Sequence, residues 1–358
     1  MPSDSPSTPV GIDRDTPSRG RGDAMTITDI ARMAGVSKKS VSRVINDEAG
    51  VSPETRERIK SIIAEVGYRP NRGARALANS RSFLIALAYN NLNPSYVLDV
   101  LKGMQDFGSP RGYEIVMYET HGEEADLPNE IRAFMARSGC DGILLTPPLS
   151  ELATMIGAFQ DETWKVARIA GDDVDLQQPQ ARFDDRAAAL SVGVHLVELG
   201  HKHIAFVGGH HASGPSRRRL AGLQDALSIH GERLDPSYIS WGDFTFESGF
   251  ESAGQLLELD PMPTAIFCVN DQMAAGAIQA VREKGLRVPN HVSVVGFDNS
   301  PLAEQVWPPL TSVSQPVREM AAGATELLVQ AITKKPVEQN RLEYSHRLTI
   351  RKTTSPPA

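Results

Sequence analysis

Residues 26–82 read TITDIARMAGVSKKSVSRVINDEAGVSPETRERIKSIIAEVGYRPNRGARALANSRS and carry the clearest local signals in the chain. Thr26, with Asp29 three positions later, is a capping-box pair that opens a helix. Gly35 then supplies a turn, after which Ser37 can cap a second short helix. Two short helices joined by a glycine turn predict a helix-turn-helix.

A third helix is expected to begin at Ser52-Pro53-Glu54, which places a cap, a first-turn proline and a first-turn acid in order. Its apolar residues recur at helical spacing, and Gly67 ends it. Residues 25–70 are therefore expected to form a small all-α domain. The apolar residues that would build its core are Ile27, Ile30, Ala31, Ala34, Val41, Val44, Ile45, Ile59, Ile62, Ile63 and Val66.

The second helix begins with two lysines, Lys38 and Lys39, at the end where the helix dipole disfavours cations by about 0.3–1 kcal/mol. Cations at this position favour a strongly negative partner such as DNA, because lysine can donate to guanine O6 and N7 in the major groove. Ser42, Arg43 and Asn46 follow on the same helix and can reach base edges or phosphates. A solvated polar face is the alternative for an isolated lysine pair.

Charge divides the chain into a basic part and an acidic part. Residues 25–82 carry 11 Lys+Arg against 6 Asp+Glu, a net charge of +5, and residues 1–24 carry −1. Residues 83–358 must then carry −11 to give the overall −7. A basic head on an acidic body favours the DNA-binding interpretation.

The motifs DIARMAGVSKKSVSRVIN, VSPETRERI and GYRPNRGARALA resemble the DNA-binding headpiece of the LacI/GalR family of bacterial transcription regulators. The resemblance implies that Lys38 and Lys39 choose the operator sequence, and that residues 71–82 form a hinge helix and linker. It also implies that Leu77 is an apolar wedge in the minor groove, with a core leucine as the alternative. The expected DNA-binding residues are Thr26, Thr28, Ser37, Lys38, Lys39, Ser42, Arg43, Asn46, Thr55, Asn71, Arg72, Arg75 and Leu77.

From residue 83 onward, short apolar runs alternate with amphipathic helical stretches. The runs are FLIALAY (83–89), YEIVMYE (113–119), GILLT (142–146), KVARIA (165–170), HIAFVGG (203–209), AIFCVN (265–270) and VSVVGF (292–297). Such alternation predicts a parallel, doubly wound sheet. About 270 residues is long for a single sheet of this kind, so two lobes are expected.

The segments VELGHKHIAFVGG, VSVVGFDNSPLAE and PPLTSVSQP extend the resemblance essentially to the C-terminus. It implies a type I periplasmic-binding-protein-like core at residues 83–350, with a ligand cleft between two α/β lobes. Residues 1–24 are expected to be a disordered tail, and residues 351–358 a second tail. Within the core, lobe 1 is expected at about 83–183 plus 315–342 and lobe 2 at about 184–314 plus 343–350.

Ligands of α/β proteins gather at the carboxyl ends of strands, and polar residues follow several of the predicted strands. A carboxylate, a guanidinium and an amide, as in Asp298, Arg219 and Asn270, suit paired hydroxyl groups. In the family these positions hold an effector, often a sugar or a purine. The effector-binding residues expected from the resemblance are Asn90, Asn93, Ser95, Tyr96, Arg219, Phe244, Asn270, Asp298 and Gln315.

Several of these residues have structural alternatives. Asn270 and Asp298 could cap the helices that follow them, and Tyr96 could equally belong to the core or to a dimer interface. Asp271 is expected to be structural rather than a ligand contact.

One segment departs from the family pattern. Arg168 interrupts an apolar strand; in the cleft it would favour an acidic or phosphorylated sugar, and a satisfied residue at the edge of the sheet is equally open. Gly171 stands near a position where some relatives have an acidic contact, which Asp172 or Asp173 could replace.

Neither a cofactor nor an enzymatic activity is expected. Cys140 and Cys268 suggest no disulfide framework or metal site, and neither a Gly-x-Ser-x-Gly elbow nor a P-loop occurs. A histidine cluster could suggest zinc, but no Cys or carboxylate has ligand spacing around it. These histidines are His201, His203, His210 and His211.

The sequence therefore predicts a cytoplasmic, homodimeric repressor of carbohydrate-utilisation genes, with a pseudo-palindromic operator in double-stranded DNA and a small sugar as its partners. Its dimer interface is expected along the predicted helix of residues 97–104.

No stretch approaches the roughly 18 apolar residues of a membrane span, and residues 1–24 lack the apolar centre of a secretory signal, so no membrane partner is expected. Two alternatives stay open: a purine- or nucleoside-responsive corepressed regulator, and a sugar-binding transport protein, which would lack residues 26–82.

Overall fold

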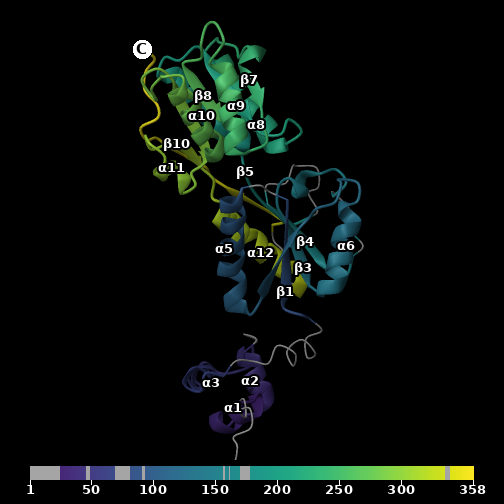
Figure 1. The fold of residues 1–358 in the computed structure, drawn as a ribbon. Helices are drawn as coiled ribbons and strands as arrows, with labels where there is room; N and C mark the ends of the chain where they lie inside the picture. The colour runs from purple at the N-terminus through teal and green to yellow at the C-terminus, as the bar shows by residue number, and fades with distance from the viewer. Residues whose placement is uncertain are drawn as a thin grey trace, which may run out of the picture. The chain divides into compact units, whose positions relative to one another are not determined.

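The computed structural model describes residues 25–45, 49–68, 81–90, 93–155, 158–160, 162–169, 178–334 and 339–358. The chain divides into two units, residues 1–81 and residues 82–358 (Figure 1). The described part of the first unit is helical. The second unit contains two six-stranded sheets with helices packed against them.

The first unit contains three helices, α1 (Ile27–Ala34), α2 (Lys38–Ile45) and α3 (Pro53–Glu65). Thr26 and Asp29 form the predicted capping box at the start of α1, where each accepts a hydrogen bond from the other's backbone N–H. Gly35 ends α1 with φ +65°, a left-handed conformation that glycine adopts without strain. The two-helix motif predicted from the sequence is thus present.

A small apolar core holds these helices together. Ile30, Val41 and Ile59, one from each helix, are fully buried in it. Ala31, Ala34 and Val44 complete its buried part, and the apolar residues at the end of α3 are only partly covered. The first unit therefore has a hydrophobic core of its own.

The first lobe of the second unit is built on a parallel sheet of strand order β11–β5–β4–β3–β1–β2. Helices α5 and α12 pack against this sheet and against each other. Helix α6 packs against the sheet through a second apolar cluster. The strands are β1 (Leu84–Tyr89), β2 (Glu114–Glu119), β3 (Gly142–Leu145), β4 (Lys165–Ile169), β5 (Gln180–Phe183) and β11 (Arg341–Tyr344). The helices are α5 (Pro94–Gly108), α6 (Leu127–Ser138) and α12 (Val317–Thr333).

The second lobe is built on a sheet of strand order β12–β10–β9–β8–β6–β7, in which only β12 is antiparallel to its neighbour. Helices α7 and α8 form one packed pair against it, and α9 and α10 form another. The strands are β6 (Ile204–Gly208), β7 (Ile239–Trp241), β8 (Ala265–Cys268), β9 (Ser293–Asp298), β10 (Thr311–Ser314) and β12 (Arg347–Thr349). The helices are α7 (Asp185–Glu198), α8 (Gly214–Ile229), α9 (Phe246–Leu256), α10 (Asp271–Glu283) and α11 (Leu302–Gln305).

The chain passes between the two lobes three times. It crosses after β5, again after β10, and a third time between β11 and β12. Because strands of each sheet end at these crossings, the residues that follow β5 and β10 lie where the lobes meet.

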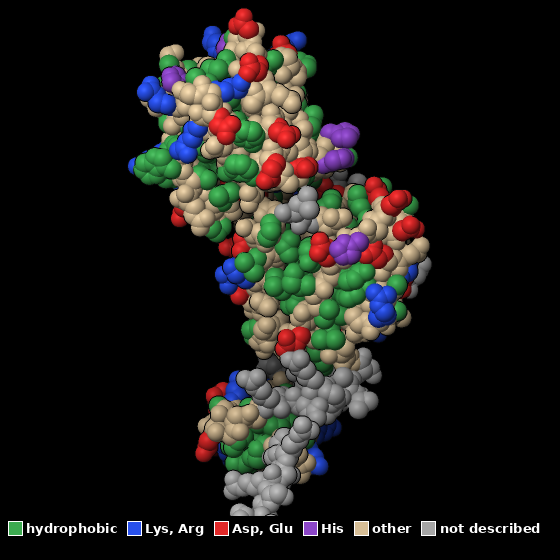
Figure 2. Space-filling model, viewed as in Figure 1, with side chains coloured by type: hydrophobic (Ala, Val, Ile, Leu, Met, Phe, Trp, Pro, Cys, Tyr) green, Lys and Arg blue, Asp and Glu red, His purple; other side chains and the backbone are tan. Residues whose placement is uncertain are grey.

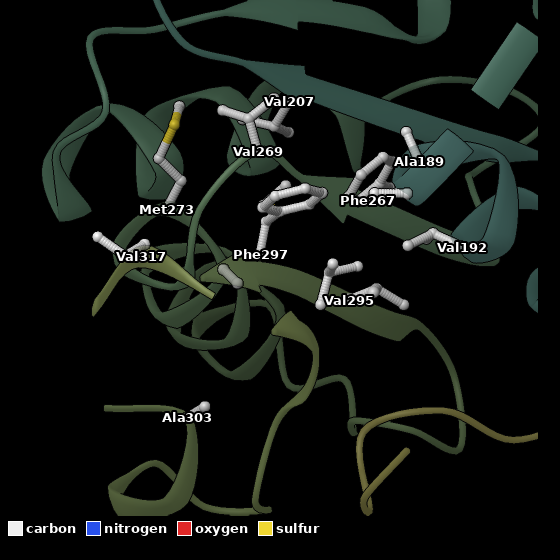
Figure 3. Close-up of a cluster of buried hydrophobic side chains, with 14 of the residues drawn as sticks. Ala189, Val192, Val207, Phe267, Val269, Met273, Val295, Phe297, Ala303 and Val317 are labelled. Atoms are coloured by element: carbon white, nitrogen blue, oxygen red, sulfur yellow. The ribbon is translucent and has the colours of Figure 1, made fainter. Parts of the chain in front are cut away.

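Phe267 and Phe297 lie at the centre of the second lobe and are fully buried (Figure 3). They come from the neighbouring strands β8 and β9, with ring centroids 6.4 Å apart. Helix residues such as Ala189, Val192 and Met273 cover them. This core fixes the strand ends that carry the polar residues described below.

The predicted architecture, a helical headpiece and two doubly wound lobes, is confirmed, and the structure differs from the expected boundaries in two places. Glu343 and Tyr344 were expected in lobe 2, but they pair with Arg182 and Phe183 in the sheet of the first lobe. Residues 351–358 were expected to be a tail. They pack on the second lobe instead, where Thr353 is fully buried and accepts a hydrogen bond from the backbone N–H of Thr311.

The described helices can also be checked for a possible membrane span. In the described ranges, no helix combines the length and the apolar character needed to cross a bilayer. The predictions for residues 1–24 and for most of residues 71–82 concern residues outside the described ranges.

Candidate functional site

Helix α2 presents a basic end in the first unit. Ser37 accepts a hydrogen bond from the backbone N–H of Ser40 and so caps this helix. Lys38 and Lys39 follow in its first turn, and both are exposed. Ser42 and Arg43, further along α2, are partly buried. Among the described residues of the first unit, the start of α2 therefore offers two exposed lysines to a partner.

The other residues expected at DNA fall into two groups. Thr26 and Thr55 take part in cap hydrogen bonds of α1 and α3, whereas Thr28 is exposed on the first turn of α1. The expected residues Asn46, Asn71, Arg72, Arg75 and Leu77 lie outside the described residues.

A cavity of about 400 Å³ lies between the two lobes of the second unit. Residues from the carboxyl ends of strands in both sheets line it, as expected for an α/β protein. Of the nine residues expected at an effector, eight line this cavity: Asn90, Asn93, Tyr96, Arg219, Phe244, Asn270, Asp298 and Gln315. Ser95 is not among the lining residues, and its backbone N–H donates to the Asn93 side chain within the first turn of α5.

Asp298, at the end of β9, is held by two amide side chains. The Asn93 amide donates to one carboxylate oxygen at 3.0 Å, and the Gln315 amide donates to the other at 2.5 Å. Burial raises the pKa of Asp298 to about 8, although the nearby Arg219 acts in the opposite direction. Asp298 therefore does not cap a helix; it links the start of α5 in the first lobe to the second lobe.

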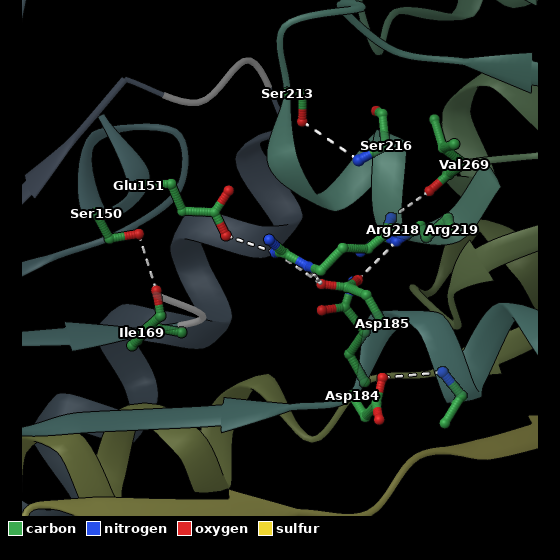
Figure 4. Close-up of polar contacts among 12 residues, drawn as sticks. Ser150, Glu151, Ile169, Asp184, Asp185, Ser213, Ser216, Arg218, Arg219 and Val269 are labelled. Carbon is green, nitrogen blue, oxygen red and sulfur yellow. Dashed lines mark hydrogen bonds and ion pairs between the residues drawn. The ribbon is translucent and has the colours of Figure 1, made fainter. Parts of the chain in front are cut away.

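Arg219, in α8, is fixed on three sides (Figure 4). Its Nε donates to Asp185 at 2.8 Å, and its Nη1 donates to the carbonyl oxygen of Val269 at 2.6 Å. The guanidinium also lies over the ring of Phe297, 3.6 Å from the centroid. Such a guanidinium is preorganised to face the cavity in one orientation.

Asn270 is both a cavity residue and a helix cap. Its side-chain oxygen accepts from the backbone N–H of Met273 at the start of α10, and its amide donates to the carbonyl oxygen of Phe244.

Phe244 itself has φ +72°, a conformation that strains a bulky residue by about 1–3 kcal/mol. Gly209 makes room for the Phe244 ring, because a Cβ at position 209 would overlap it. The strained backbone thus places an aromatic ring against the cavity.

Asp271, the neighbour of Asn270, has the structural role that was expected. It is 1% exposed, and its carboxylate accepts hydrogen bonds from Ser300 and Ser312. These bonds tie α10 to β10 and to the loop after β9. Burial raises the pKa of Asp271 to about 6.

The first-lobe side of the cavity is largely apolar. Tyr96 lines it, and burial raises the pKa of its hydroxyl, with the carboxylate of Asp298 acting in the same direction. Pro147, Pro148 and Leu152 come from the segment that follows β3. An apolar wall facing carboxylates and amides is the usual lining of a small-molecule site.

Sequence reasoning did not select several lining residues. Asp185 and Phe183 flank the first crossing after β5, a four-residue strand that the apolar pattern alone did not reveal. Glu124, Asp243 and His210 come from loops, where no periodic signal exists. The position of Asp185 one residue after Asp184, the helix cap of α7, was the available signal.

Arg168 is a structural residue. It lies in β4, is 2% exposed, and donates to the carbonyl oxygen of Met155 at 3.3 Å. It is not among the residues that line the cavity, so the interpretation that it favours an acidic or phosphorylated sugar is wrong. Gly171, Asp172 and Asp173 lie outside the described residues.

The four histidines considered for zinc have separate environments. His201 contacts Thr264 and the carbonyl oxygen of Ser355, and His203 stacks on Tyr238. His210 and His211 are exposed neighbours, with ring centroids 4.8 Å apart. In the part of the chain that the structure describes, no three His, Cys, Asp or Glu residues are grouped to hold a metal ion.

Comparison with known proteins agrees with this arrangement. Residues 26–71 match the family model described as bacterial regulatory proteins, lacI family, and residues 194–354 match a periplasmic binding protein-like domain. Catabolite control protein A of Priestia megaterium is 33% identical over 337 residues, which cover 92% of this chain and 99% of that protein. The transcriptional regulator CelR of Thermobifida fusca is 32% identical over 339 residues, covering 91% and 97%.

Solved structures give the same result. A structure of a CelR–cellobiose complex has a TM-score of 0.70 and 31% identity, covering 92% of this chain and 99% of that one. The Lac repressor dimer bound to operator and an anti-inducer has a TM-score of 0.70 and 30% identity, covering 93% and 100%. A two-lobed ligand-binding core joined to a helix-turn-helix defines a class of bacterial regulators. The chain belongs to the lacI family of bacterial regulatory proteins.

Proposed function

We propose that this protein is a sequence-specific DNA-binding transcription regulator, a repressor whose operator binding is modulated by a sugar held between its lobes. The observation that carries the proposal is the cavity, which gathers eight of the nine residues expected at an effector. The relatives named above are regulators, not enzymes. Because the operator is genomic DNA, we place the protein in the cytoplasm.

The lining of the cavity favours a neutral sugar. Among the described lining residues, four carry carboxyl groups, Glu124, Asp185, Asp243 and Asp298, whereas Arg219 is the single guanidinium and is paired with Asp185. Because burial raises the pKa of Asp298 to about 8, that group is largely protonated at neutral pH, which leaves three formal negative charges in the lining. A phosphate or carboxylate on the ligand would meet repulsion there. Figure 2 shows acidic side chains on both lobes, in agreement with the net negative charge of residues 83–358. Hydroxyl groups, by contrast, can donate to these carboxylates and accept from Arg219.

The volume of the cavity and its apolar wall further restrict the kinds of ligand that fit. About 400 Å³ is at the small end of the range of about 300–1,000 Å³ for small-molecule sites, and suits a mono- or disaccharide. The rings of Phe244 and Tyr96 and the two prolines offer flat apolar surface to the C–H faces of a sugar. We propose that Asn90, Asn93, Asn270, Asp298 and Gln315 supply its polar contacts. A purine effector is the alternative.

We further propose that the protein acts as a homodimer in which the two copies of α2 enter successive major grooves of a pseudo-palindromic operator. Lys38 and Lys39 would then contact bases and phosphates. Leu98 on α5 is 48% exposed, which suits an interface along α5 in the first lobe. Residues 71–82, with Leu77, would form the hinge at the centre of the operator, and the effector would change operator affinity through the lobes.

The test is fluorescence anisotropy with a labelled palindrome from the gene's own upstream region. The protein is titrated first, and mono- and disaccharides, cellobiose among them, and purines are then added. We expect tight binding that one sugar weakens. Binding that appears only with a purine would mean corepression and overturn the sugar assignment, and no specific binding at moderate salt would overturn DNA binding itself.

Replacing Lys38 and Lys39 with alanine tests the contact surface directly. We expect operator affinity to fall about tenfold or more, with a shallower dependence on salt concentration, because both base and phosphate contacts are lost. The matched control is Lys60→Ala, which removes an exposed cation from α3 in the same unit. An equal loss in the control would mean that general charge, rather than the start of α2, carries the binding.

A further inference from the structure

Two charged side chains from different lobes meet beside the cavity. Glu151, in the short 3₁₀ helix η2 (Leu149–Glu151) of the first lobe, accepts a hydrogen bond at 2.6 Å from Arg218 in α8 of the second lobe (Figure 4). The Glu151 side chain is 8% exposed and that of Arg218 is 28% exposed, so water screens this ion pair less than a surface pair. The pair therefore links the two lobes.

The Glu151 carboxylate is also seated at the first turn of α8. Gly214 is the first residue of this 16-residue helix, and a Cβ at position 214 would overlap the Glu151 carboxylate and lie 2.9 Å from Nη1 of Arg218. The positive end of the helix dipole favours a carboxylate at this place. The absence of a side chain at Gly214 leaves the space in which the carboxylate fits.

The same pair connects to the cavity through one shared carboxylate. Arg218 donates to one oxygen of Asp185 at 3.1 Å, and the other oxygen accepts from Arg219 at 2.8 Å. Asp185 is 2% exposed, so a buried carboxylate joins the two guanidinium groups. Burial acts to lower the pKa of Arg218, but Asp185 and Glu151 outweigh it and raise that pKa, which keeps the guanidinium charged.

We propose that Glu151 and Arg218 form a latch that holds the two lobes around the cavity, with Gly214 as the seat of the Glu151 carboxylate. Neither side chain lines the cavity, so both act as positioning residues. When the latch opens, the fraction of molecules with an enclosed cavity falls, and apparent effector affinity falls with it. Only this last consequence rests on the proposed function.

Spin labels on the two lobes test the latch without DNA or effector. Ala136→Cys in α6 and Gln255→Cys in α9 place labels on exposed helix positions, and the native Cys140 and Cys268 are buried. Mixing with excess unlabelled protein leaves most labelled dimers with one labelled subunit. Pulsed electron–electron double resonance then gives the distribution of distances between the two spin labels, one on each lobe.

Two independent variants open the latch in different ways. Glu151→Gln removes the charge but keeps the shape, and Gly214→Ala displaces the carboxylate while it leaves every charge in place. We expect both to shift the distance distribution to longer and broader values than in the parent chain. If one variant fails to fold, the other decides.

The matched control is Arg186→Gln. It removes the ion pair of Arg186 with Asp225, which joins α7 and α8 inside the second lobe at 2.5 Å and does not reach the first lobe. We expect the parent distance distribution in this control. An unchanged distribution in Glu151→Gln and Gly214→Ala, or an equal shift in Arg186→Gln, would overturn the latch. A failure of the sugar or DNA proposal would leave this measurement unaffected.

Discussion

Asp298 shows how one carboxyl group can serve both the fold and the proposed effector. The amide groups of Asn93 and Gln315 each donate to one of its oxygens, so Asp298 bridges the lobes. A sugar hydroxyl that donates to Asp298 would share or replace one of these amides. The groups that act on its charge are Arg219, which favours ionisation, and Asp271 and Asp185, which oppose it.

The raised pKa of Asp298 makes stability depend on pH. The folded-state pKa is about 8, whereas an unfolded aspartate has a pKa of about 3.9, so between these values the folded chain binds more protons. The contribution of Asp298 to the free energy of unfolding therefore falls as pH rises from about 4 to about 8. Asp298→Asn cannot ionise, and we expect this contribution to vanish in urea denaturation measured at pH 5 and pH 8.

Asp225→Asn is the control for this titration. Arg186 lowers the pKa of Asp225, so its titration falls below the pH window of the experiment. We expect the parent difference between pH 5 and pH 8 in this variant. If Asp298→Asn retains that difference as well, other groups cause it.

At the scale of elements, α7 and α8 approach each other closely through small residues. A Cβ at Gly222 in α8 would overlap the carbonyl oxygen of Arg186 and lie 2.9 Å from the Cβ of Ala189 in α7. Because backbone atoms cannot retreat as a flexible side chain can, this contact sets the distance between the two helices. The same helices carry Asp185 and Arg219, so the packing also sets the geometry of the cavity wall.

Replacing Gly222 with alanine is expected to lower the free energy of unfolding by about 1–3 kcal/mol, the usual effect of overpacking. The control is Gly254→Ala in α9, where a Cβ meets no atom within 4 Å. There we expect a gain of about 0.5–1 kcal/mol from helix propensity. Urea denaturation measures both, and losses of equal size in the two variants would contradict the packing explanation.

At the scale of the whole molecule, the C-terminal segment completes the second lobe. The carbonyl oxygen of Thr353 accepts from the backbone N–H of Val294 in β9, and its hydroxyl accepts from the backbone N–H of Thr311 in β10. Ser355 adds hydrogen bonds with Ser293 and His201. The last residues of the chain thus lie against the first residues of the inner strands β9 and β10.

Thr353→Val keeps the shape of the side chain but removes the oxygen that accepts from Thr311. A buried N–H without a partner should lower the free energy of unfolding by about 1–3 kcal/mol. Thr154→Val, at an exposed position, is the control and should stay within about 0.5 kcal/mol of the parent. Equal stability of Thr353→Val and the parent would mean that this segment contributes little to the lobe.

Local signals in the sequence predicted the elements well. The capping box at Thr26, the turn at Gly35 and the proline start of α3 each act through neighbouring residues, so their effect is readable from a short window. The apolar runs that became β1, β3, β6, β8 and β9 are buried on both faces and read as continuous. The short strands β5, β7 and β12 lack such a run, which is why residue pattern alone did not reveal them.

The sequence by itself determined the helical headpiece and the doubly wound core, because these follow from local propensity and from motifs with fixed spacing. Its resemblance to a known family gave eight of the side chains around the cavity. Only the tertiary structure decided which charges meet. Arg168 is covered by neighbouring segments, Asp185 joins Arg218 and Arg219, and Glu151 reaches the first turn of α8. Partners that are tens of residues apart in the chain are brought together by sheet packing, and no local pattern encodes that choice.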